Sequence, residues 1–390
     1  MNTTAAPIHV AILSPLQRKP GLTQGGLEVV VTHVANALCR KGLKVDVLVM
    51  PPRGGDPNPP GLDELARVID LKSQHKFIGF FTLLGYLRKE RPDVLLAAGH
   101  RSNMLALNTT ALLSSPPCVI LGVHNMLSRQ MSQFKPFKRW LRTQAIRRRY
   151  PRSEAVIAVS RGVAEDLRGH FRIPRKQVHT INNPVVTEAL YKRAMEPLDH
   201  PWFSSGAPPV ILAVGRLRPQ KDFATLIRAF HILQRRRPCR LLILGEGRER
   251  PKLEALVREL ELESCVSLPG FVENPLPYMK HAALFVLSSA WEGFGNVLVE
   301  ALSTGVPVVS TDCPSGPREI LEGGRYGRLV PPGDIAALAV AMQETLDSPP
   351  ERELLMKAAR RFDVESATNA YLDLLTNCLM AKSERDTSHE

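Results

Sequence analysis

The sequence predicts an α/β protein made of two doubly wound, parallel-sheet domains. Short apolar segments alternate with helix-length amphipathic segments, and this alternation runs twice, before and after a Pro-, Ser-, Gly- and Asp-rich stretch at 184–209. A chain of 390 residues suits about two domains. We expect domains at 1–195 and 196–380, followed by a frayed polar tail at 381–390.

The first domain is expected to open with a strand, a glycine-containing turn at 21–26, a helix and a second strand, which is the start of a doubly wound sheet. The apolar segments that follow predict parallel strands. The segments predicted here are strands at 9–13, 44–50, 94–98, 119–123 and 156–159 and a helix at 27–40.

The second domain repeats the alternation and ends in two helices that we expect to close it. Two sheets of this kind are expected to face each other across a cleft, with ligands at the carboxyl ends of the strands. The segments predicted here are strands at 210–214, 240–244, 266–268, 284–287 and 306–310 and helices at 222–236, 250–260, 296–304, 351–361 and 365–379.

Composition excludes several classes of protein. Hydrophobic residues make up 44% and charged residues 23% of the chain, which excludes a disordered or collagen-like protein. The longest apolar run, 77–87, is too short to span a bilayer, and 1–12 has no signal-peptide pattern. We therefore expect a cytoplasmic protein. Six scattered cysteines without a CxxC pair indicate reduced, mostly buried thiols.

Positive charge is concentrated in the first half of the chain. Residues 1–195 hold 29 Lys and Arg against 12 Asp and Glu, whereas the remainder holds 22 against 26. Such a basic half favours contact with an extended anionic partner: membrane headgroups, a lipid pyrophosphate or nucleic acid.

The densest basic stretch, 135–152, has eight Lys and Arg and no acidic residue. Phe137, Trp140, Leu141 and Ala145 recur in it at helical spacing. The pattern predicts a helix that lies in an anionic membrane interface, where each nearby cation gains ~1 kcal/mol. The alternative is a packed helix whose arginines face water.

The segment 215–222 follows a predicted strand and opens a helix. Arg216 and Lys221 beside free helix amides predict an anion site, and Asp222 is suited to cap the helix. A solvated basic turn is the alternative.

A sharper pattern follows the strand predicted at 284–287. Gly293 and Gly295 allow close backbone approach, and a helix begins near Asn296 with its amides toward the ligand. Glu292 and Glu300 flank this turn and could grip hydroxyls on the two sides of a diphosphate, a transferred sugar at Glu292 and a ribose at Glu300. A core ion pair is the alternative for Glu300, because an unpaired buried carboxylate is costly.

Two weaker signals lie in the first half. Gly25 and Gly26 occupy the first strand-to-helix loop, where either a ligand contact or an ordinary tight turn fits. His124 follows a buried strand and is either a catalytic or a structural histidine.

The sequence resembles the retaining glycosyltransferases of family 4, which share the two-domain GT-B fold. The resemblance rests on motifs in family order over about 210–335, with a QGGLE loop and a strand-end histidine in the first half. The motifs are GRLRPQKD, LGEGRERPKLE, LPGF, SSAWEGFGNVLVEALSTGVPVVSTDCPSGPREIL and GRLVPPGD. The longest of them contains the Glu-x7-Glu element of Glu292 and Glu300.

The resemblance implies a nucleotide-sugar donor in the second domain and an acceptor in the first. It implies that Arg216 and Lys221 hold the donor diphosphate and that Glu292 and His124 contact the transferred sugar, these four being the catalytic residues. It implies no metal and no cofactor. The donor-binding residues implied are Gly25, Gly26, Arg216, Lys221, Glu292, Phe294, Gly295, Asn296, Val297 and Glu300.

The resemblance further implies a hexosyl- or N-acetylhexosaminyltransferase of polysaccharide or lipopolysaccharide assembly. We expect front-face retention, in which Glu292 is not a covalent nucleophile, and a UDP-sugar donor in preference to GDP-mannose. Together with the basic half, it favours a lipid-linked or glycolipid acceptor at the inner face of the cytoplasmic membrane, with a soluble acceptor as the alternative. The competing functions are a GDP-mannose-dependent mannosyltransferase, a GT-B sugar-nucleotide epimerase and a basic nucleic-acid-binding protein, although no nucleic-acid-binding motif is visible.

Overall fold

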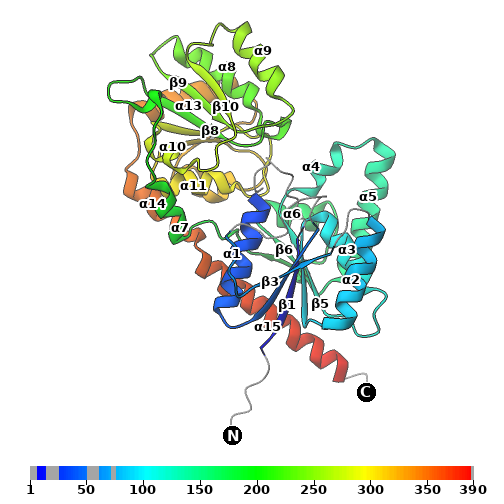
Figure 1. Ribbon diagram of the computed structural model, residues 1–390. Helices are drawn as coiled ribbons and strands as arrows, with labels where there is room; N and C mark the ends of the chain where they lie inside the picture. Colours follow the sequence, from blue (N-terminus) through cyan, green and yellow to red (C-terminus); the bar gives the residue numbers. More distant parts are fainter. Residues whose placement is uncertain (1–6, 15–25, 51–60, 72–75, 388–390) are drawn as a thin grey trace. The chain divides into compact units, whose positions relative to one another are not determined.

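The computed structural model describes residues 7–14, 26–50, 61–71 and 76–387 (Figure 1). The chain forms two compact units. Unit 1 contains the described residues up to Pro184 together with those from Val364 onward, and unit 2 is Val185–Asp363.

Unit 1 is built on a seven-stranded parallel sheet with the order β3-β2-β1-β4-β5-β6-β7. The chain starts at β1 and adds strands first on one side and then on the other, so the order reverses between β1 and β4. Ligands of such sheets bind at this switch point. The strands are β1 (His9–Leu13), β2 (Lys44–Val49), β3 (Arg67–Asp70), β4 (Val94–Ala98), β5 (Cys118–Val123), β6 (Ala155–Ala158) and β7 (Val178–Thr180).

Helices α1 and α15 pack against each other, and their apolar side chains share one buried cluster with the strands of unit 1. In Figure 1, α15 is the long red helix beside α1. The helices of this unit are α1 (Gly26–Arg40), α2 (Lys76–Glu90), α3 (His100–Thr110), α4 (Leu127–Ser132), α5 (Pro136–Arg149), α6 (Arg161–Gly169) and α15 (Val364–Thr387).

The last helix corrects two sequence predictions. The segment 365–379 is expected to close the second domain, but Tyr371, Leu374 and Leu375 are buried in the core of unit 1. The expected frayed tail at 381–390 is helical as far as Thr387.

Unit 2 has a six-stranded parallel sheet with the order β10-β9-β8-β11-β12-β13, and its order reverses between β8 and β11. The strands are β8 (Val210–Val214), β9 (Arg240–Leu244), β10 (Val266–Gly270), β11 (Leu284–Leu287), β12 (Val308–Thr311) and β13 (Arg328–Val330). The helices are α7 (Glu188–Ala194), α8 (Phe223–Gln234), α9 (Arg250–Glu259), α10 (Leu276–His281), α11 (Asn296–Thr304), α12 (Pro317–Ile320), α13 (Ile335–Asp347) and α14 (Arg352–Ala359).

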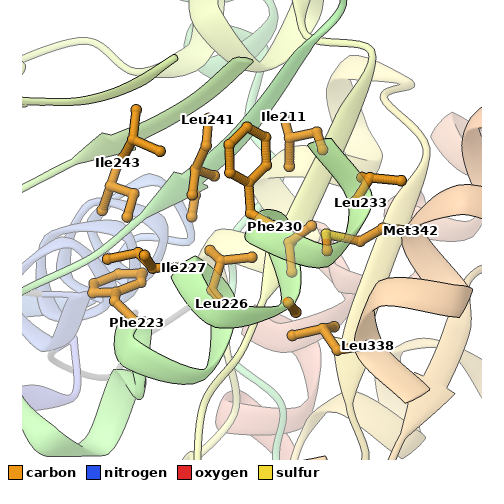
Figure 2. Close-up of a cluster of buried hydrophobic side chains, with 14 of the residues drawn as sticks. Ile211, Phe223, Leu226, Ile227, Phe230, Leu233, Leu241, Ile243, Leu338 and Met342 are labelled. Atoms are coloured by element: carbon orange, nitrogen blue, oxygen red, sulfur yellow. The ribbon is translucent and has the colours of Figure 1, made fainter. Parts of the chain in front are cut away.

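The core of unit 2 lies between its sheet and helices α8 and α13. Figure 2 shows Phe230 of α8 among strand residues such as Ile211 and Leu241, with Leu338 and Met342 of α13 close by. This packing fixes the strand ends from which the candidate site is built.

The division between the units differs from the predicted boundary at 195. The backbone amides of Val185 and Val186 donate hydrogen bonds to the carbonyl of Phe362, and Val186 forms a β-bridge with Asp363. The chain therefore passes from unit 1 to unit 2 after Pro184 and returns to unit 1 after Asp363. Helix α7 also lies in the stretch predicted to be an irregular linker.

No helix among the described segments is both long and apolar enough to cross a membrane. The six cysteines are buried and free, as the sequence predicted.

Candidate functional site

The candidate site of unit 2 lies at the carboxyl ends of β8 and β11, where the order of the sheet reverses. Lys221 comes from the segment between β8 and α8, and Glu292 from the loop after β11. Asp222, with φ 45°, caps α8 by accepting hydrogen bonds from the backbone and hydroxyl of Thr225, which confirms its predicted role.

Glu292 is held by three donors. Lys221 Nζ and Ser289 Oγ each lie 2.6 Å from its Oε1, and Gln220 Nε2 lies 3.4 Å from its Oε2. The side chain of Glu292 is 8% exposed and that of Lys221 16%. Oε1 is therefore saturated with short contacts, whereas Oε2 keeps capacity for another donor.

The two loops that carry this pair are joined by hydrogen bonds. Ser288 Oγ donates to the carbonyl of Lys221 at 2.8 Å, and Gln220 Nε2 donates to the carbonyl of Trp291 at 3.0 Å. Thr311 Oγ1, at the end of β12, donates to the carbonyl of Ser289 at 2.6 Å. These contacts fix Glu292 from three strand ends.

A glycine turn leads from Glu292 into α11. Gly295 precedes the helix with φ 103° and, as a glycine, has no side chain to cap it. Gly316 lies against this turn with φ 93°, and a Cβ there would be 1.8 Å from the carbonyl oxygen of Phe294. Phe294 is itself buried and contacts the ring of Phe362 edge to face at 5.2 Å. The first amides of α11 are thus presented by a rigid turn, in an arrangement suited to an anion.

Glu300 lies one turn into α11. Burial raises the pKa of its carboxyl, and the charges of Arg193 and Lys221 oppose this shift. Across the described residues, no group donates a hydrogen bond to its carboxylate or forms an ion pair with it. The described residues therefore do not support the alternative of a core ion pair for Glu300. Its carboxylate can accept hydrogen bonds, but no described residue donates one to it.

Three arginines lie on the adjoining loops after β8 and β9. Arg216, Arg218 and Arg248 are exposed. The pKa of Arg218 is lowered by partial desolvation of its side chain and then by the charges of Arg216 and Arg248. Gly245, with φ 144°, lets these loops touch, because a Cβ there would be 2.0 Å from the carbonyl oxygen of Gly215. Because its side chain is exposed, Arg216 is available to an anionic ligand.

Two other predicted residues that the structure describes belong to unit 1. His124 follows β5, and burial lowers its pKa to about 4 against an opposing hydrogen bond with Asn183, so its imidazole is neutral at pH 7. Its buried Nδ1 has no partner within the described ranges. Gly26 is the first residue of α1, and Gly25 lies outside the described residues.

The structure therefore brings Lys221, Glu292 and the start of α11 together within unit 2. The helix begins at Asn296, as predicted, with Phe294 and Gly295 directly before it and Val297 as its second residue. Sequence reasoning missed Gln220 and Ser289 as partners of Glu292. The available signal was the pair of serines directly after the strand predicted at 284–287.

Metal ions are held in proteins by gathered His, Cys, Asp and Glu side chains. In the described ranges, no three of these side chains lie together as ligands of one ion.

Two family models match the chain in succession. Residues 24–189 match Glycosyltransferase Family 4, and residues 197–362 match Glycosyl transferases group 1. Together they cover most of both units, although neither reaches α15.

Curated relatives carry related names. A Campylobacter jejuni N-acetylgalactosaminyltransferase, named for a diacetylbacillosaminyl-diphospho-undecaprenol, is 38% identical over 46% of this chain and 47% of its own length. The lipopolysaccharide core biosynthesis glycosyltransferase LpsE of Rhizobium meliloti is 26% identical over 90% of this chain and 96% of its own. An uncharacterised Methanocaldococcus jannaschii glycosyltransferase is 30% identical over 62% of this chain and 61% of its own length. The chain therefore matches about half of the Campylobacter enzyme and about three fifths of the Methanocaldococcus protein.

Solved structures show the same fold. The Anabaena protein HepE in complex with UDP superposes with a TM-score of 0.72 at 19% identity, covering 95% of this chain and all of that one. The lipopolysaccharide outer core galactosyltransferase WaaB superposes with a TM-score of 0.68 at 20% identity, covering 96% and 99%. Both sheets described above fit this GT-B fold.

Proposed function

Because the chain belongs to the family 4, group 1 glycosyltransferases of the GT-B fold, we propose that it moves a sugar from a UDP-sugar to a lipid-linked saccharide or glycolipid acceptor, with retention at the anomeric carbon. The observation that carries this proposal is the buried Lys221–Glu292 pair beside the glycine turn that leads into α11. The setting is glycoconjugate assembly, which the names of LpsE and the Campylobacter enzyme support.

The donor diphosphate is proposed to lie against Arg216, Lys221 and the first amides of α11. Cleavage of the sugar–phosphate bond leaves negative charge on the departing diphosphate, and fixed donors aimed at that charge lower the barrier. Lys221 can hold Glu292 and bind phosphate at the same time, because an ammonium that donates to Glu292 still has two N–H donors for phosphate. On this proposal these cations do the work that a divalent ion does in other enzymes, so no metal is required.

Glu292 is proposed to position the sugar rather than attack it. Its Oε1 already accepts from Lys221 and Ser289, which lowers its nucleophilicity, while Oε2 can accept from a sugar hydroxyl. The acceptor hydroxyl then attacks from the side of the leaving diphosphate and passes its proton to it. The neutral imidazole of His124 is proposed to contact the transferred sugar, with Gly25 and Gly26 near the diphosphate.

Glu300 is proposed to bind the ribose. Its carboxylate lacks a donor among the described residues, and two vicinal hydroxyls would supply two. The raised pKa favours this use, since a buried carboxylate gains more from each donor than an exposed one.

A nucleotide panel tests the donor assignment. UDP, GDP and ADP are compared by thermal shift and calorimetry with EDTA present, and a ligand at ~100 times its dissociation constant adds ~2.7 kcal/mol of stability. We expect UDP to stabilise the protein selectively and Lys221→Ala and Glu300→Ala to remove the effect. Selective stabilisation by GDP would favour a GDP-mannose donor, and no stabilisation by any nucleotide would overturn the proposal.

Helix α5 is proposed to bind the anionic inner face of the cytoplasmic membrane. Phe137, Trp140 and Leu141 are 73%, 56% and 47% exposed, and the first two rings stack at 6.4 Å. Thr143 and Ile146 form its buried side, so these large apolar residues are not used for packing within unit 1. An apolar, cationic and exposed helix surface suits the headgroup region of a bilayer.

Sedimentation with liposomes tests this surface. We expect salt-sensitive binding to vesicles that contain phosphatidylglycerol, and loss of binding in Phe137→Ser with Trp140→Ser. Leu112→Ser is the matched control, because Leu112 is 57% exposed elsewhere in unit 1. Equal binding by both variants would remove α5 from the proposal.

A further inference from the structure

Unit 1 contains a strongly cationic region, of which the proposed function uses only His124 and the exposed surface of α5. From 94 to 153 the sequence has ten Lys and Arg and no Asp or Glu. Within this stretch, β4 ends at Ala98, Gly99 turns with φ 87°, and α3 begins at His100. We call His100, Arg101 and Arg142 the His100 cluster.

A chain of hydrogen bonds fixes the tautomer of His100. Asn103 Nδ2 donates to the Gly122 carbonyl at 3.0 Å and to Tyr150 Oη at 3.2 Å. The Tyr150 hydroxyl is buried and lies 3.1 Å from His100 Nδ1. Because its oxygen already accepts from Asn103, we assign its proton to the bond with Nδ1. Since Nδ1 accepts, the ring proton of neutral His100 lies on Nε2, which becomes a donor.

The charges of the two arginines of the cluster act on this imidazole. The pKa of His100 is lowered to about 4 by burial and then by the charges of Arg142 and Arg101. In the described part of the chain, neither guanidinium forms an ion pair. Arg142 stacks over the Phe134 ring at 4.0 Å, which leaves its N–H groups free.

Every group of the cluster is therefore a hydrogen-bond donor. The start of α3 adds the amides of a helix N-terminus, and its N-cap residue, Gly99, has no side chain to bond them. Ser102, in the first turn, is fully buried, and its hydroxyl has no partner among the described residues. These hydrogen-bond donors have no acceptor, and the arginine charges make their surroundings positive. Such a site is complementary to an anion such as a phosphate.

We propose that the His100 cluster binds the phosphate or diphosphate group of the acceptor. This inference rests on the proposed function and deepens it, because it names a phosphorylated acceptor and the residues that select it. The carrier is an isoprenoid or other lipid diphosphate, whose apolar chain would lie in the same membrane as α5. Arg142 connects the two surfaces, since it belongs to α5 and acts on His100.

The test titrates the full-length chain with geranyl diphosphate while the imidazole C–H signals are followed by NMR; His100→Gln assigns the His100 signal. We expect saturable binding that raises the pKa of His100, because the anion offsets the charges of Arg101 and Arg142. A merely structural His100 would not respond. The double variant Arg101→Gln, Arg142→Gln should weaken binding at least about tenfold, which corresponds to ~1.4 kcal/mol.

Arg129→Gln is the matched control, because Arg129 is an exposed arginine of the same acid-free stretch and does not act on His100. Equal weakening by the control would overturn the assignment to this cluster. Inorganic pyrophosphate and phosphatidylglycerol vesicles form two further arms. If the double variant loses vesicle binding but keeps geranyl diphosphate binding, the ligand is a bulk headgroup and the acceptor assignment is wrong.

UDP binding is measured on the same samples. If UDP binds to wild type and to the double variant while geranyl diphosphate binds to neither, the acceptor inference alone fails. If UDP does not bind to wild type, the proposed function fails, whatever the result with the diphosphate.

Discussion

The ammonium of Lys221 lies 2.6 Å from Oε1 of Glu292, and the two residues are 71 positions apart in the chain. Their side chains are nearly buried, and they join the loops of two neighbouring strands at the switch point of unit 2. Removal of either partner leaves a buried charge without its counterpart, a change that typically costs ~3–5 kcal/mol.

Lys221→Ala should therefore destabilise unit 2 and abolish UDP binding, because both the ion pair and a phosphate ligand are lost. Glu292→Gln should retain UDP binding but lower kcat by about 100-fold or more, since it perturbs sugar positioning and the preorganised charge. Urea unfolding, calorimetry and transfer assays measure these effects. Lys252→Ala is the control, because Lys252 is 76% exposed in its pair with Glu249. Loss of UDP binding in Glu292→Gln would contradict the separation of the two roles.

Glu300→Gln should make the free protein more stable at pH 7 and the donor complex weaker. Burial raises the pKa of Glu300 above its ordinary 4.5, so its ionised form is a cost to the folded state at neutral pH. The amide removes this cost, and the gain should vanish below pH 4.5, where both the folded and the unfolded carboxyl are protonated. Thermal unfolding across this range measures the gain.

Ribose recognition provides the second readout of Glu300. Calorimetry with UDP and 2′-deoxy-UDP should show that Glu300→Gln binds UDP at least about tenfold more weakly and discriminates less between the two. A variant that is less stable at pH 7 and still distinguishes these nucleotides would refute the assignment.

Gly316→Ala should impair donor binding by moving the turn before α11. Its Cβ would lie 1.8 Å from the Phe294 carbonyl oxygen, and φ 93° already disfavours an L side chain. Gly333→Ala is a matched control, since Gly333 has φ 77° but a Cβ there would meet no atom within 4 Å. We expect a tenfold or greater loss of UDP affinity in the first variant, which corresponds to about 1.4 kcal/mol or more, and little change in the second. Similar losses in both would point to backbone strain instead.

Asp46→Asn should destabilise unit 1. Burial alone would raise the pKa of Asp46, but hydrogen bonds from Arg67, Tyr86 and His9 lower it to about 2. This carboxylate therefore contributes stability that is present above its ordinary pKa of 3.8 and is lost as the pH falls through 2. The variant should lose ~3 kcal/mol at pH 7 and converge with wild type near pH 2 in urea unfolding. The exposed Asp373→Asn should show no such pH-dependent difference.

Most strands could be predicted from the sequence because parallel strands buried on both faces are continuous apolar runs. β3 was not predicted, because its four residues, RVID, are exposed or half-buried and do not form an apolar run. The position of α15 in unit 1 was not predicted for another reason. The periodicity of Tyr371, Leu374 and Leu375 predicts a helix with an apolar side, but it does not say which sheet that side covers.

The site was predictable as a set of residues rather than as contacts. The strand ends indicated Lys221 and Glu292 separately, one for phosphate and one for sugar. Their ion pair depends on β8 and β11 being neighbours, which is a property of strand order. The hydrogen-bond chain to His100 likewise depends on Tyr150, which is 50 residues away in sequence.

The return of α15 to unit 1 reverses the order in which the chain can fold during its synthesis. Unit 2 is a continuous segment whose ends meet where Val186 bridges to Asp363, so it is complete before the last helix is made. The apolar surface of the first sheet and α1 that receives Leu374 and Leu375 stays exposed until those residues leave the ribosome. The part of the protein translated first is thus the last to be finished, and a ribosome that stops early at the 3′ end of the message releases a chain whose first unit has part of its apolar core exposed.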